Sequence, residues 1–230
     1  MSAYDFVAGE LLLIDKPLEW TSFDVVNKVR NAVLRTLEQK KIKVGHAGTL
    51  DPLATGLLLI GTGRMTKKIN ELLVLDKEYT GTILLGGTTP SFDLETEVDA
   101  TFPTDQLTEE GILAAAKRLT GSIVQTPPAF SAKKIKGERA YKKARRGETV
   151  ELKGNNVTID TFEITAIRGP EVDFRIVCSK GTYIRSIAHD LGKELQNGGH
   201  LTKLCRTRIG TYHLADALPL NDFVSALDNG

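Results

Sequence analysis

The spacing of apolar residues along this 230-residue chain predicts alternating strands and helices. Short apolar runs, and runs in which apolar and polar residues alternate, indicate strands that end at Gly, Pro or polar clusters. The clearest alternation covers 172–178, where Val172, Phe174, Ile176 and Cys178 share one face. The strands expected from such runs are 10–14, 42–44, 57–60, 79–85, 122–125, 157–167, 172–178 and 206–214.

Apolar residues at helical spacing indicate helices between these strands. Over 22–37 the apolar side chains fall on one face and the charged ones on the other, and Ser22 is expected to cap this helix. Thr108 is expected to cap a second amphipathic helix. The other predicted helices are 67–75, about 138–145, 182–195 and a short one near the end of the chain. Since no strand–helix–strand repeat appears, we expect an α+β fold with a mixed, largely antiparallel central sheet and flanking helices, in a single domain of residues 1–230.

The composition is typical of a folded protein and shows no candidate membrane span. Hydrophobic residues make up 41% of the chain, and no apolar stretch approaches the ~20 residues that a membrane span needs. The N-terminus has neither the basic start nor the apolar core of a signal peptide. Cys178 and Cys205 form no paired-cysteine motif, which favours a reducing compartment over a disulfide scaffold. We therefore expect a cytoplasmic protein.

The segment 45–56, Gly-His-Ala-Gly-Thr-Leu-Asp-Pro-Leu-Ala-Thr-Gly, predicts a rigid loop that holds one carboxylate between two buried strands. Its three glycines allow backbone conformations that a Cβ would forbid. Pro52 fixes its own φ angle and keeps Asp51 extended. An isolated Asp-Pro pair is most often a turn in which the Asp side chain caps nearby N–H groups. The residues around Asp51 therefore decide between a turn and a catalytic loop.

Those residues resemble the active-site motif of the TruB family of pseudouridine synthases, which isomerise uridine 55 in the T-loop of tRNA. The match is long and nearly unbroken, so it is far more specific than a short spaced pattern. It implies a pseudouridine synthase fold and the T-arm stem-loop of tRNA as the partner. The resemblance extends over about residues 11–220. The further blocks that resemble the family are 13–17 with 21–22, 77–79, 126–133, 137–141, 178–185 and 204–207.

The resemblance assigns three residues to the chemistry. Pseudouridine formation breaks the bond between uracil N1 and ribose and rejoins the base through C5, so it needs a carboxylate, a pocket and a group that takes the C5 proton. Asp51 resembles the family's carboxylate, Arg185 its partner arginine, and Tyr183 the better candidate for the proton transfer. Without the resemblance, Arg185 would be interpreted as a surface arginine at a helix start and Tyr183 as a core tyrosine with a satisfied hydroxyl.

Further residues resemble those that hold the substrate. Tyr79 and Tyr183 align with the family's two pocket tyrosines, whose rings suit a flipped uracil because stacking replaces what the base loses on leaving the helix. Leu204 resembles the apolar contact to the bound base, and His46 resembles the histidine that holds the rearranged T-loop. Taken alone, Tyr79 and Leu204 would be core residues, and His46 a capping residue or a metal ligand.

One segment of the chain is strongly basic, although the net charge of the chain is only +1. Residues 132–148 include eight basic residues and only two acidic ones, Glu138 and Glu148. Such a basic arm can bind a polyanion locally, and it resembles the family's RNA-gripping thumb, at about residues 128–153. The alternative is a solvated helix face, the commonest fate of a charge run. The residues expected on the RNA backbone are Lys133, Lys134, Lys136, Arg139, Lys142, Lys143, Arg145 and Arg146.

No cofactor or metal is expected, because the isomerisation is redox-neutral and the four histidines show no ligand spacing. The chain departs from the family pattern at 18–20, Leu-Glu-Trp, where a glycine is usual before Thr21-Ser22. Over 89–96 only Asp93 of the usual acidic pattern remains, which puts RNA contacts from this loop in question.

Three functional hypotheses follow. The chain ends soon after Leu220, so we expect that it lacks the C-terminal PUA-type domain of many family members. This favours a stand-alone tRNA enzyme, expected to be a monomer without an obligatory protein partner, over the guide-RNA-dependent relative, which works with partner proteins. The third hypothesis is a non-catalytic RNA-binding or tRNA-folding module.

Overall fold

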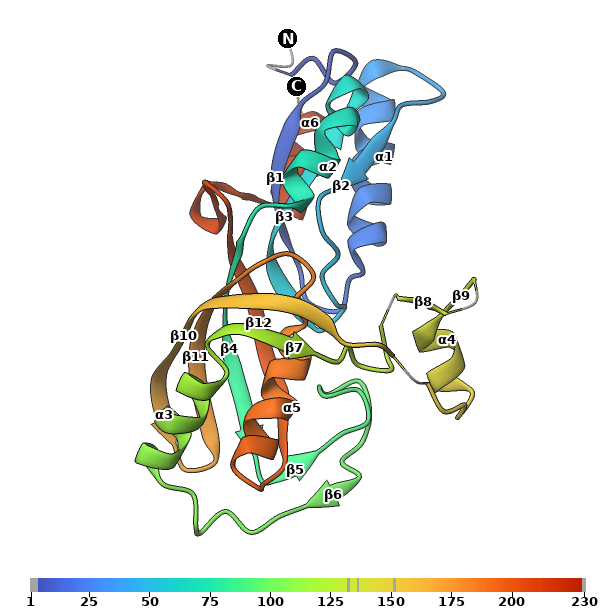
Figure 1. Ribbon diagram of the computed structural model, residues 1–230. Coiled ribbons are helices and arrows are strands. Elements are labelled where there is room, and N and C mark those ends of the chain that lie inside the picture. The colour runs from blue at the N-terminus through green and yellow to red at the C-terminus, as the bar shows by residue number, and fades with distance from the viewer. Residues whose placement is uncertain (1–3, 132, 136, 151, 229–230) are drawn as a thin grey trace. The chain divides into compact units, whose positions relative to one another are not determined.

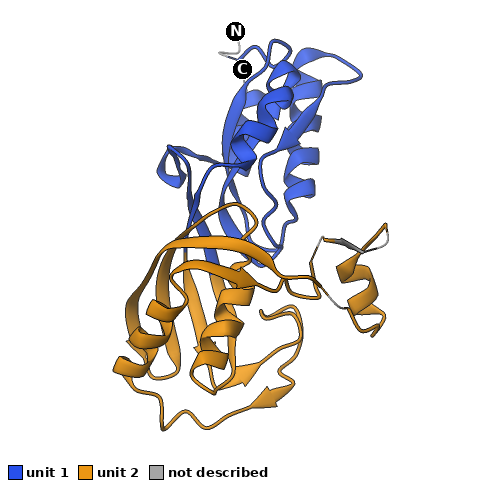
Figure 2. Cartoon of the chain, viewed as in Figure 1, with its two compact units in different colours: residues 1–79, 204–230 blue, residues 80–203 orange. Residues whose placement is uncertain are grey.

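The computed structural model describes residues 4–131, 133–135, 137–150 and 152–228. The chain forms two compact units (Figure 2). Unit 1 comprises Met1–Tyr79 and Leu204–Gly230, so it is built from both ends of the chain, and unit 2 is Thr80–Lys203. Two strands, β4 (Lys77–Leu85) and β12 (Gly199–Ile209), contribute residues to both units. The sequence analysis expects one catalytic domain that includes both units, and this stays a prediction.

The sheet of unit 1 is built around β3 (Ala54–Thr62). This strand pairs antiparallel with β1 (Leu11–Lys16) and β2 (Val44–His46), and parallel with the second half of β12. Two short strands extend it, β14 (Leu218–Pro219) parallel to β1 and β13 (Tyr212–His213) antiparallel to β12. The mixed sheet predicted from the sequence is therefore confirmed.

Both faces of this sheet are covered (Figure 1). Alternate residues of β3 pack against α1 (Ser22–Leu37) and α6 (Leu220–Asp228) on one face. The residues between them pack against α2 (Ile69–Leu73) and the 3-10 turn before it, η1 (Gly63–Lys68). A strand buried on both faces needs a continuous apolar run, which is why 57–60 shows no alternation.

Unit 2 is built on largely antiparallel strands. β10 (Asn155–Arg168) pairs antiparallel with both of its neighbours, and every second residue of β11 (Glu171–Cys178) is buried, as the alternation predicted. Helix α3 (Glu109–Arg118) is tied to α5 (Ile184–Glu194) by an ion pair between Arg118 and Glu194 at 2.7 Å. The strands follow one another in space as the first part of β12, then β4, β11 (Glu171–Cys178), β10 (Asn155–Arg168) and β7 (Gly121–Gln125).

The predicted basic insertion lies between β7 and β10 (Figure 1). It consists of a two-stranded ladder, β8 (Lys134–Ile135) with β9 (Glu138–Arg139), followed by α4 (Ala140–Arg145). Between β4 and α3 the chain forms a long loop that is rich in acidic residues, called the acidic loop below. A second small ladder closes the base of that loop, β5 (Gly87–Thr88) with β6 (Ala100–Thr101).

The predicted cap of the first helix was wrong by one residue. Thr21 is the N-cap, because its hydroxyl accepts a hydrogen bond from the backbone N–H of Asp24 at 3.1 Å while the Asp24 carboxylate accepts one from the backbone N–H of Thr21. This reciprocal pair is a capping box. It leaves the hydroxyl of Ser22, the first helical residue, available to the Asp51 loop.

The predicted last strand, 206–214, was wrong at both ends. β12 begins at Gly199 and turns at Gly210 into the short strand β13. Gly199 is needed at the start of the strand because a Cβ there would lie 2.6 Å from the carbonyl oxygen of Ala188. At Gly210 a left-handed φ of +54° makes the turn.

We predict that Gly56→Ala destabilises the protein far more than Gly121→Ala. Both glycines have similar left-handed φ angles, +102° and +98°, so backbone strain of about 1–2 kcal/mol is common to both. A Cβ at Gly56 would also collide with the backbone of Arg206, whereas nothing lies within 4 Å of one at Gly121. Urea unfolding should show an additional loss of about 1–3 kcal/mol for Gly56→Ala, and equal losses would contradict this packing.

Candidate active site

Asp51 lies, partly exposed, in the segment 47–53 that joins β2 to β3. Backbone hydrogen bonds fix both ends of the segment, from Ala47 N–H to the Leu59 carbonyl at 2.9 Å and from Ala54 N–H to the Asp51 carbonyl at 3.1 Å. Gly48 takes a φ of +96°, a conformation that favours glycine. The rigid loop predicted from the sequence is therefore present.

Ser22 holds the residue before Asp51 from the start of α1. Its buried hydroxyl accepts a hydrogen bond from the backbone N–H of Leu50 at 2.8 Å and donates one to the Leu50 carbonyl at 3.2 Å. Both backbone groups of Leu50 are thus satisfied by one side chain. The two adjacent hydroxyls therefore have different roles, since Thr21 caps the helix and Ser22 holds the loop at Leu50.

Lys16 holds the residue after Asp51 from the end of β1. The side chain is fully buried, and its ammonium donates to the carbonyls of Pro17 (2.9 Å), Trp20 (2.6 Å) and Pro52 (3.3 Å). Burial lowers the pKa of Lys16 to about 8, and attraction to the Asp51 carboxylate is the largest effect that opposes this lowering. These contacts tie the end of β1 to the Asp51 loop, and they add a positive charge close to Asp51.

Unit 1 also holds three of the predicted substrate-binding residues. Leu204 is buried on β12, directly opposite Ala54 in the parallel ladder with β3. Tyr79 is buried on β4. His46 ends β2, and burial is the main cause that lowers its pKa. Its buried Nδ1 has no hydrogen-bond partner among the residues that the structure describes.

Tyr183 is positioned in unit 2 as the N-cap residue of α5. The buried side chain of Gln125, at the end of β7, accepts a hydrogen bond from the backbone N–H of Tyr183 at 2.8 Å and donates one to its carbonyl at 3.1 Å. Both backbone groups of Tyr183 are thereby fixed. The structure thus gives Gln125 a role that nothing in the sequence pattern signals.

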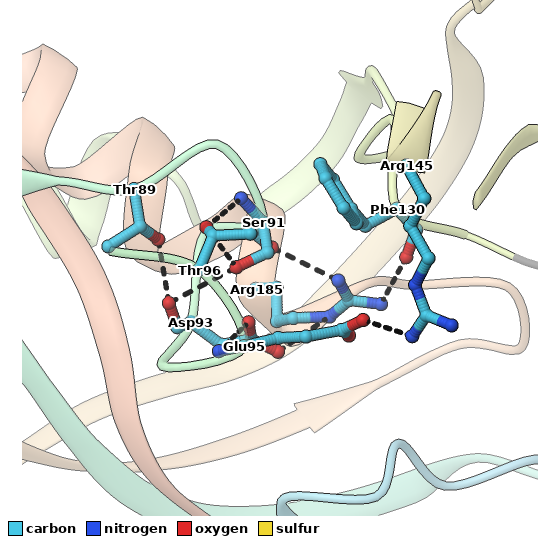
Figure 3. Close-up of polar contacts among 8 residues, drawn as sticks. All are labelled: Thr89, Ser91, Asp93, Glu95, Thr96, Phe130, Arg145 and Arg185. Carbon is cyan, nitrogen blue, oxygen red and sulfur yellow. Dashed lines mark hydrogen bonds and ion pairs between the residues drawn. The ribbon is translucent and has the colours of Figure 1, made fainter. Parts of the chain in front are cut away.

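Arg185, in the first turn of α5, is buried, with 3% of its side chain exposed. Its guanidinium donates to the carbonyls of Ser91 (3.0 Å) and Phe130 (2.9 Å), and its Nε lies 3.5 Å from a carboxylate oxygen of the buried Asp93 (Figure 3). The other Asp93 oxygen accepts a hydrogen bond from the backbone N–H of Glu95 at 3.0 Å. The interpretation of Arg185 as a surface residue is therefore wrong.

Hydroxyl side chains fix the acidic loop around Asp93. Thr89 and Ser91 both donate to the Asp93 carbonyl, at 2.7 and 3.2 Å, and the Ser91 and Thr96 hydroxyls lie 2.8 Å apart (Figure 3). These residues stand where the sequence departs from the family pattern. The departure therefore leaves Asp93 firmly held as the partner of Arg185.

The predicted site residues are divided between the two units. Asp51, His46, Tyr79 and Leu204 belong to unit 1, and the remaining two, Tyr183 and Arg185, belong to unit 2. Within unit 2 the charge of Arg185 has Asp93 as its counter-ion. Pairing of Arg185 with Asp51 stays a prediction.

The arginines of α4 and its C-cap, in the basic arm, form ion pairs with nearby glutamates. Arg145 pairs with Glu95 of the acidic loop (Figure 3), and Arg146 pairs with Glu138 at 2.7 Å and Glu148 at 2.6 Å. Both arginines are exposed. Solvent screens exposed ion pairs strongly, so these pairs leave the arginines able to exchange carboxylates for phosphates.

Other arm cations differ in their surroundings. Lys133 donates to the Lys153 carbonyl at 3.1 Å and to the Asn155 side chain at 3.0 Å, which ties the insertion to β10. Arg139 and Lys142 are exposed. Lys136 and the side chain of Lys134 lie outside the described part of the chain. RNA contacts from the arm stay a prediction.

Within the described ranges, no group of three or more His, Cys, Asp or Glu side chains is placed to hold a metal ion. No helix in those ranges is long and apolar enough to cross a membrane.

The comparison with known families decides the identity. A model of the TruB family pseudouridylate synthase N-terminal domain matches residues 35–184, and one of the tRNA pseudouridylate synthase B C-terminal domain matches residues 185–229. The chain belongs to the TruB family. The family resemblance carried by the Asp51 loop is thereby confirmed.

Curated relatives match this TruB family member over almost its whole length. It is 54% identical to tRNA pseudouridine synthase B of Phocaeicola vulgatus, over 97% of this chain and 95% of that protein. It is also 54% identical to tRNA pseudouridine synthase B of Flavobacterium johnsoniae, over 99% of this chain and 100% of that protein.

Solved structures share the fold. A Cbf5-Nop10-Gar1 complex matches with a TM-score of 0.70 and 27% identity, over 96% of this chain and 54% of that one. An archaeal box H/ACA sRNP Nop10-Cbf5 complex matches with a TM-score of 0.68 and 28% identity, over the same shares. The chain thus spans about half the length of these two solved chains. The predicted fold class is confirmed.

We predict that Lys16 makes the stability of this TruB protein rise with pH. The pKa of Lys16 is about 8 in the folded state against an ordinary 10.5, so between these values only the unfolded state keeps the proton. Unfolding then takes up a proton, and the free energy of unfolding should grow by up to about 3 kcal/mol from pH 8 to pH 10.5.

The measurement is urea unfolding of the parent and of Lys16→Met across this pH range. The difference between the two proteins isolates Lys16, since all other titrations are common to both. A difference that does not change with pH would contradict the buried, partly deprotonated lysine.

Proposed function

We propose that this chain isomerises uridine 55 in the T-loop of tRNA to pseudouridine, by base flipping and Asp51-dependent cleavage and re-formation of the glycosidic bond. The proposal includes a monomeric, cytoplasmic enzyme that needs no cofactor and no obligatory protein partner. The observation that carries it is the 54% identity to tRNA pseudouridine synthase B over nearly the full length of both proteins.

The identities also favour tRNA over a guide RNA. The Cbf5 chains of H/ACA complexes are 27–28% identical to this one, which spans about half of their length. The relatives named for tRNA are twice as similar and of the same extent. A substrate RNA recognised by this chain alone is therefore the better-supported interpretation.

The chemistry divides among six residues. Asp51, whose neighbours are fixed by Ser22 and Lys16, is the carboxylate that acts at the ribose while the N1 bond breaks. Tyr183, held by Gln125, takes the C5 proton after the base rejoins the sugar. Arg185 is proposed as the cationic partner of Asp51, and His46 as a contact to the T-loop. Tyr79 stacks on the flipped uracil, and Leu204 makes an apolar contact to it.

Incubation of the purified chain with an unmodified T-arm hairpin, followed by detection of pseudouridine, tests the proposal. We expect conversion at position 55 without guide RNA, partner protein or added metal. A matched hairpin with cytidine at that position should remain unmodified. Absence of pseudouridine from a hairpin that the chain binds would favour the RNA-binding or tRNA-folding module.

We predict that Asp51→Asn lowers turnover at least about 1,000-fold while hairpin affinity and melting temperature stay near those of the parent. The amide is nearly isosteric but can neither attack the sugar nor carry charge. Asp216→Asn, an exposed change in the same unit, is the matched control and should turn over normally. Comparable turnover by Asp51→Asn and the parent would remove Asp51 from the mechanism.

We predict that replacing Lys142, Lys143, Arg145 and Arg146 together by Gln weakens hairpin binding far more than it slows the bound complex. For each phosphate that the arm no longer neutralises, the log–log slope of binding against salt concentration should flatten by roughly 0.7–0.9. The control replaces four exposed lysines of unit 1 by Gln, which removes the same net charge, and they are Lys28, Lys40, Lys41 and Lys43.

The control should leave the slope of the salt dependence almost unchanged. If both sets of substitutions flatten it equally, the arm contributes only net charge, and its assignment to the RNA backbone is wrong.

A further inference from the structure

Arg206 lies against the Asp51 loop from the neighbouring strand β12. It stands opposite Gly56 in the parallel ladder with β3, and only 1% of the residue is exposed. It is among the largest fully buried side chains of the described structure. The sequence placed it in a block that resembles the family but gave it no role.

The guanidinium of Arg206 joins two carbonyls that flank Asp51 on either side. Nε donates to the carbonyl of Leu57 at 2.8 Å, and Nη2 donates to the carbonyl of Gly48 at 3.1 Å. Gly48 precedes Asp51 by three residues and Leu57 follows it by six. One planar group therefore sets the span of the segment that carries the carboxylate.

One glycine allows the backbone of Arg206 to lie close to β3. A Cβ at Gly56 would lie 2.4 Å from the carbonyl oxygen of Arg206 and 2.7 Å from its backbone nitrogen. A Cβ at Gly48 would lie 3.5 Å from Nη1 of Arg206, which is an ordinary van der Waals contact. The lack of a Cβ at Gly56 therefore sets how closely β12 approaches β3 at Arg206.

The charge of Arg206 is not explained by an ion pair. Among the residues that the structure describes, no carboxylate lies within ion-pair distance of its guanidinium, and backbone carbonyls alone accept its bonds. A buried charge without a counter-ion is costly to a fold. Stability alone therefore does not account for an arginine at this position.

We propose that Arg206 is a positioning residue for the isomerisation: by bonding the carbonyls of Gly48 and Leu57 it holds the Asp51 carboxylate in its reactive place. This inference rests on the proposed function. Arg206 is assigned a positioning role because its guanidinium bonds the loop backbone, at the carbonyls of Leu57 and Gly48. It acts through the backbone of the 48–57 segment.

The test compares Arg206→Lys and Arg206→Met with Arg208→Met. Arg208 lies two residues further along β12 and pairs with Asp76 at 2.9 Å, so its replacement removes the same charge without touching the Asp51 loop. The readouts are the single-turnover rate constant at saturating hairpin, the hairpin dissociation constant, and hydrogen–deuterium exchange of residues 48–57.

Arg206→Met should lower the rate constant roughly 100-fold, the scale expected when a reacting group is misplaced by about 1 Å. Arg206→Lys should recover part of this, since a lysine reaches one carbonyl and lacks the planar fork. Both should bind the hairpin within about threefold of the parent and exchange faster over 48–57. Arg208→Met should match the parent in all three readouts.

A folded Arg206→Lys with parental rate constant and parental exchange would overturn the inference, whether or not Arg206→Met folds. So would a decrease in rate that Arg208→Met matches. If the parent itself forms no pseudouridine, the proposed function fails, and the exchange data alone then decide whether Arg206 fixes the loop.

Discussion

The Asp51 segment keeps its shape because two buried cations donate hydrogen bonds to its backbone. Lys16 bonds the carbonyl of Pro52, and Arg206 bonds those of Gly48 and Leu57. Backbone carbonyls accept hydrogen bonds from both cations, and these bonds offset only part of the desolvation cost of each charge. The sheet of unit 1 places these two cations, since β1 carries Lys16 and β12 carries Arg206, and the two strands flank β3.

In unit 2 the buried cation is stabilised by an ion pair. Arg185 is also buried, but Asp93 is its counter-ion, and two carbonyls complete its contacts. The acidic loop that carries Asp93 is locked by Thr89 and Ser91. A charge that is compensated in this way can be held at the start of α5 beside Tyr183, whose backbone is fixed by Gln125.

Much of this could be predicted from the sequence, because the signals were local. The alternation at 172–178 and the apolar run at 57–60 predicted the strands, and the glycines around Asp51 predicted a rigid loop. The cap at Thr21 was missed because Ser is in general the better cap, and the hydrogen bonds of Ser22 to Leu50, a residue distant in sequence, were not foreseen.

The roles of Gln125, Asp93 and Arg206 could not be predicted for the same reason. Each bonds a partner that is distant in sequence, and no periodicity reports such a contact. The burial of Arg185 was likewise hidden, because an arginine in a first helical turn gives no sign of a carboxylate that stands 92 positions before it.

The central claim is that Asp51 acts on a uridine taken out of the T-loop. A crystal structure of Asp51→Asn bound to an unmodified T-arm hairpin tests it most directly. The account predicts that nucleotide 55 is flipped from the loop, with its glycosidic carbon beside residue 51 and its base against Tyr79. A bound hairpin in which nucleotide 55 stays stacked, or in which another residue's carboxylate faces its sugar, would contradict the account.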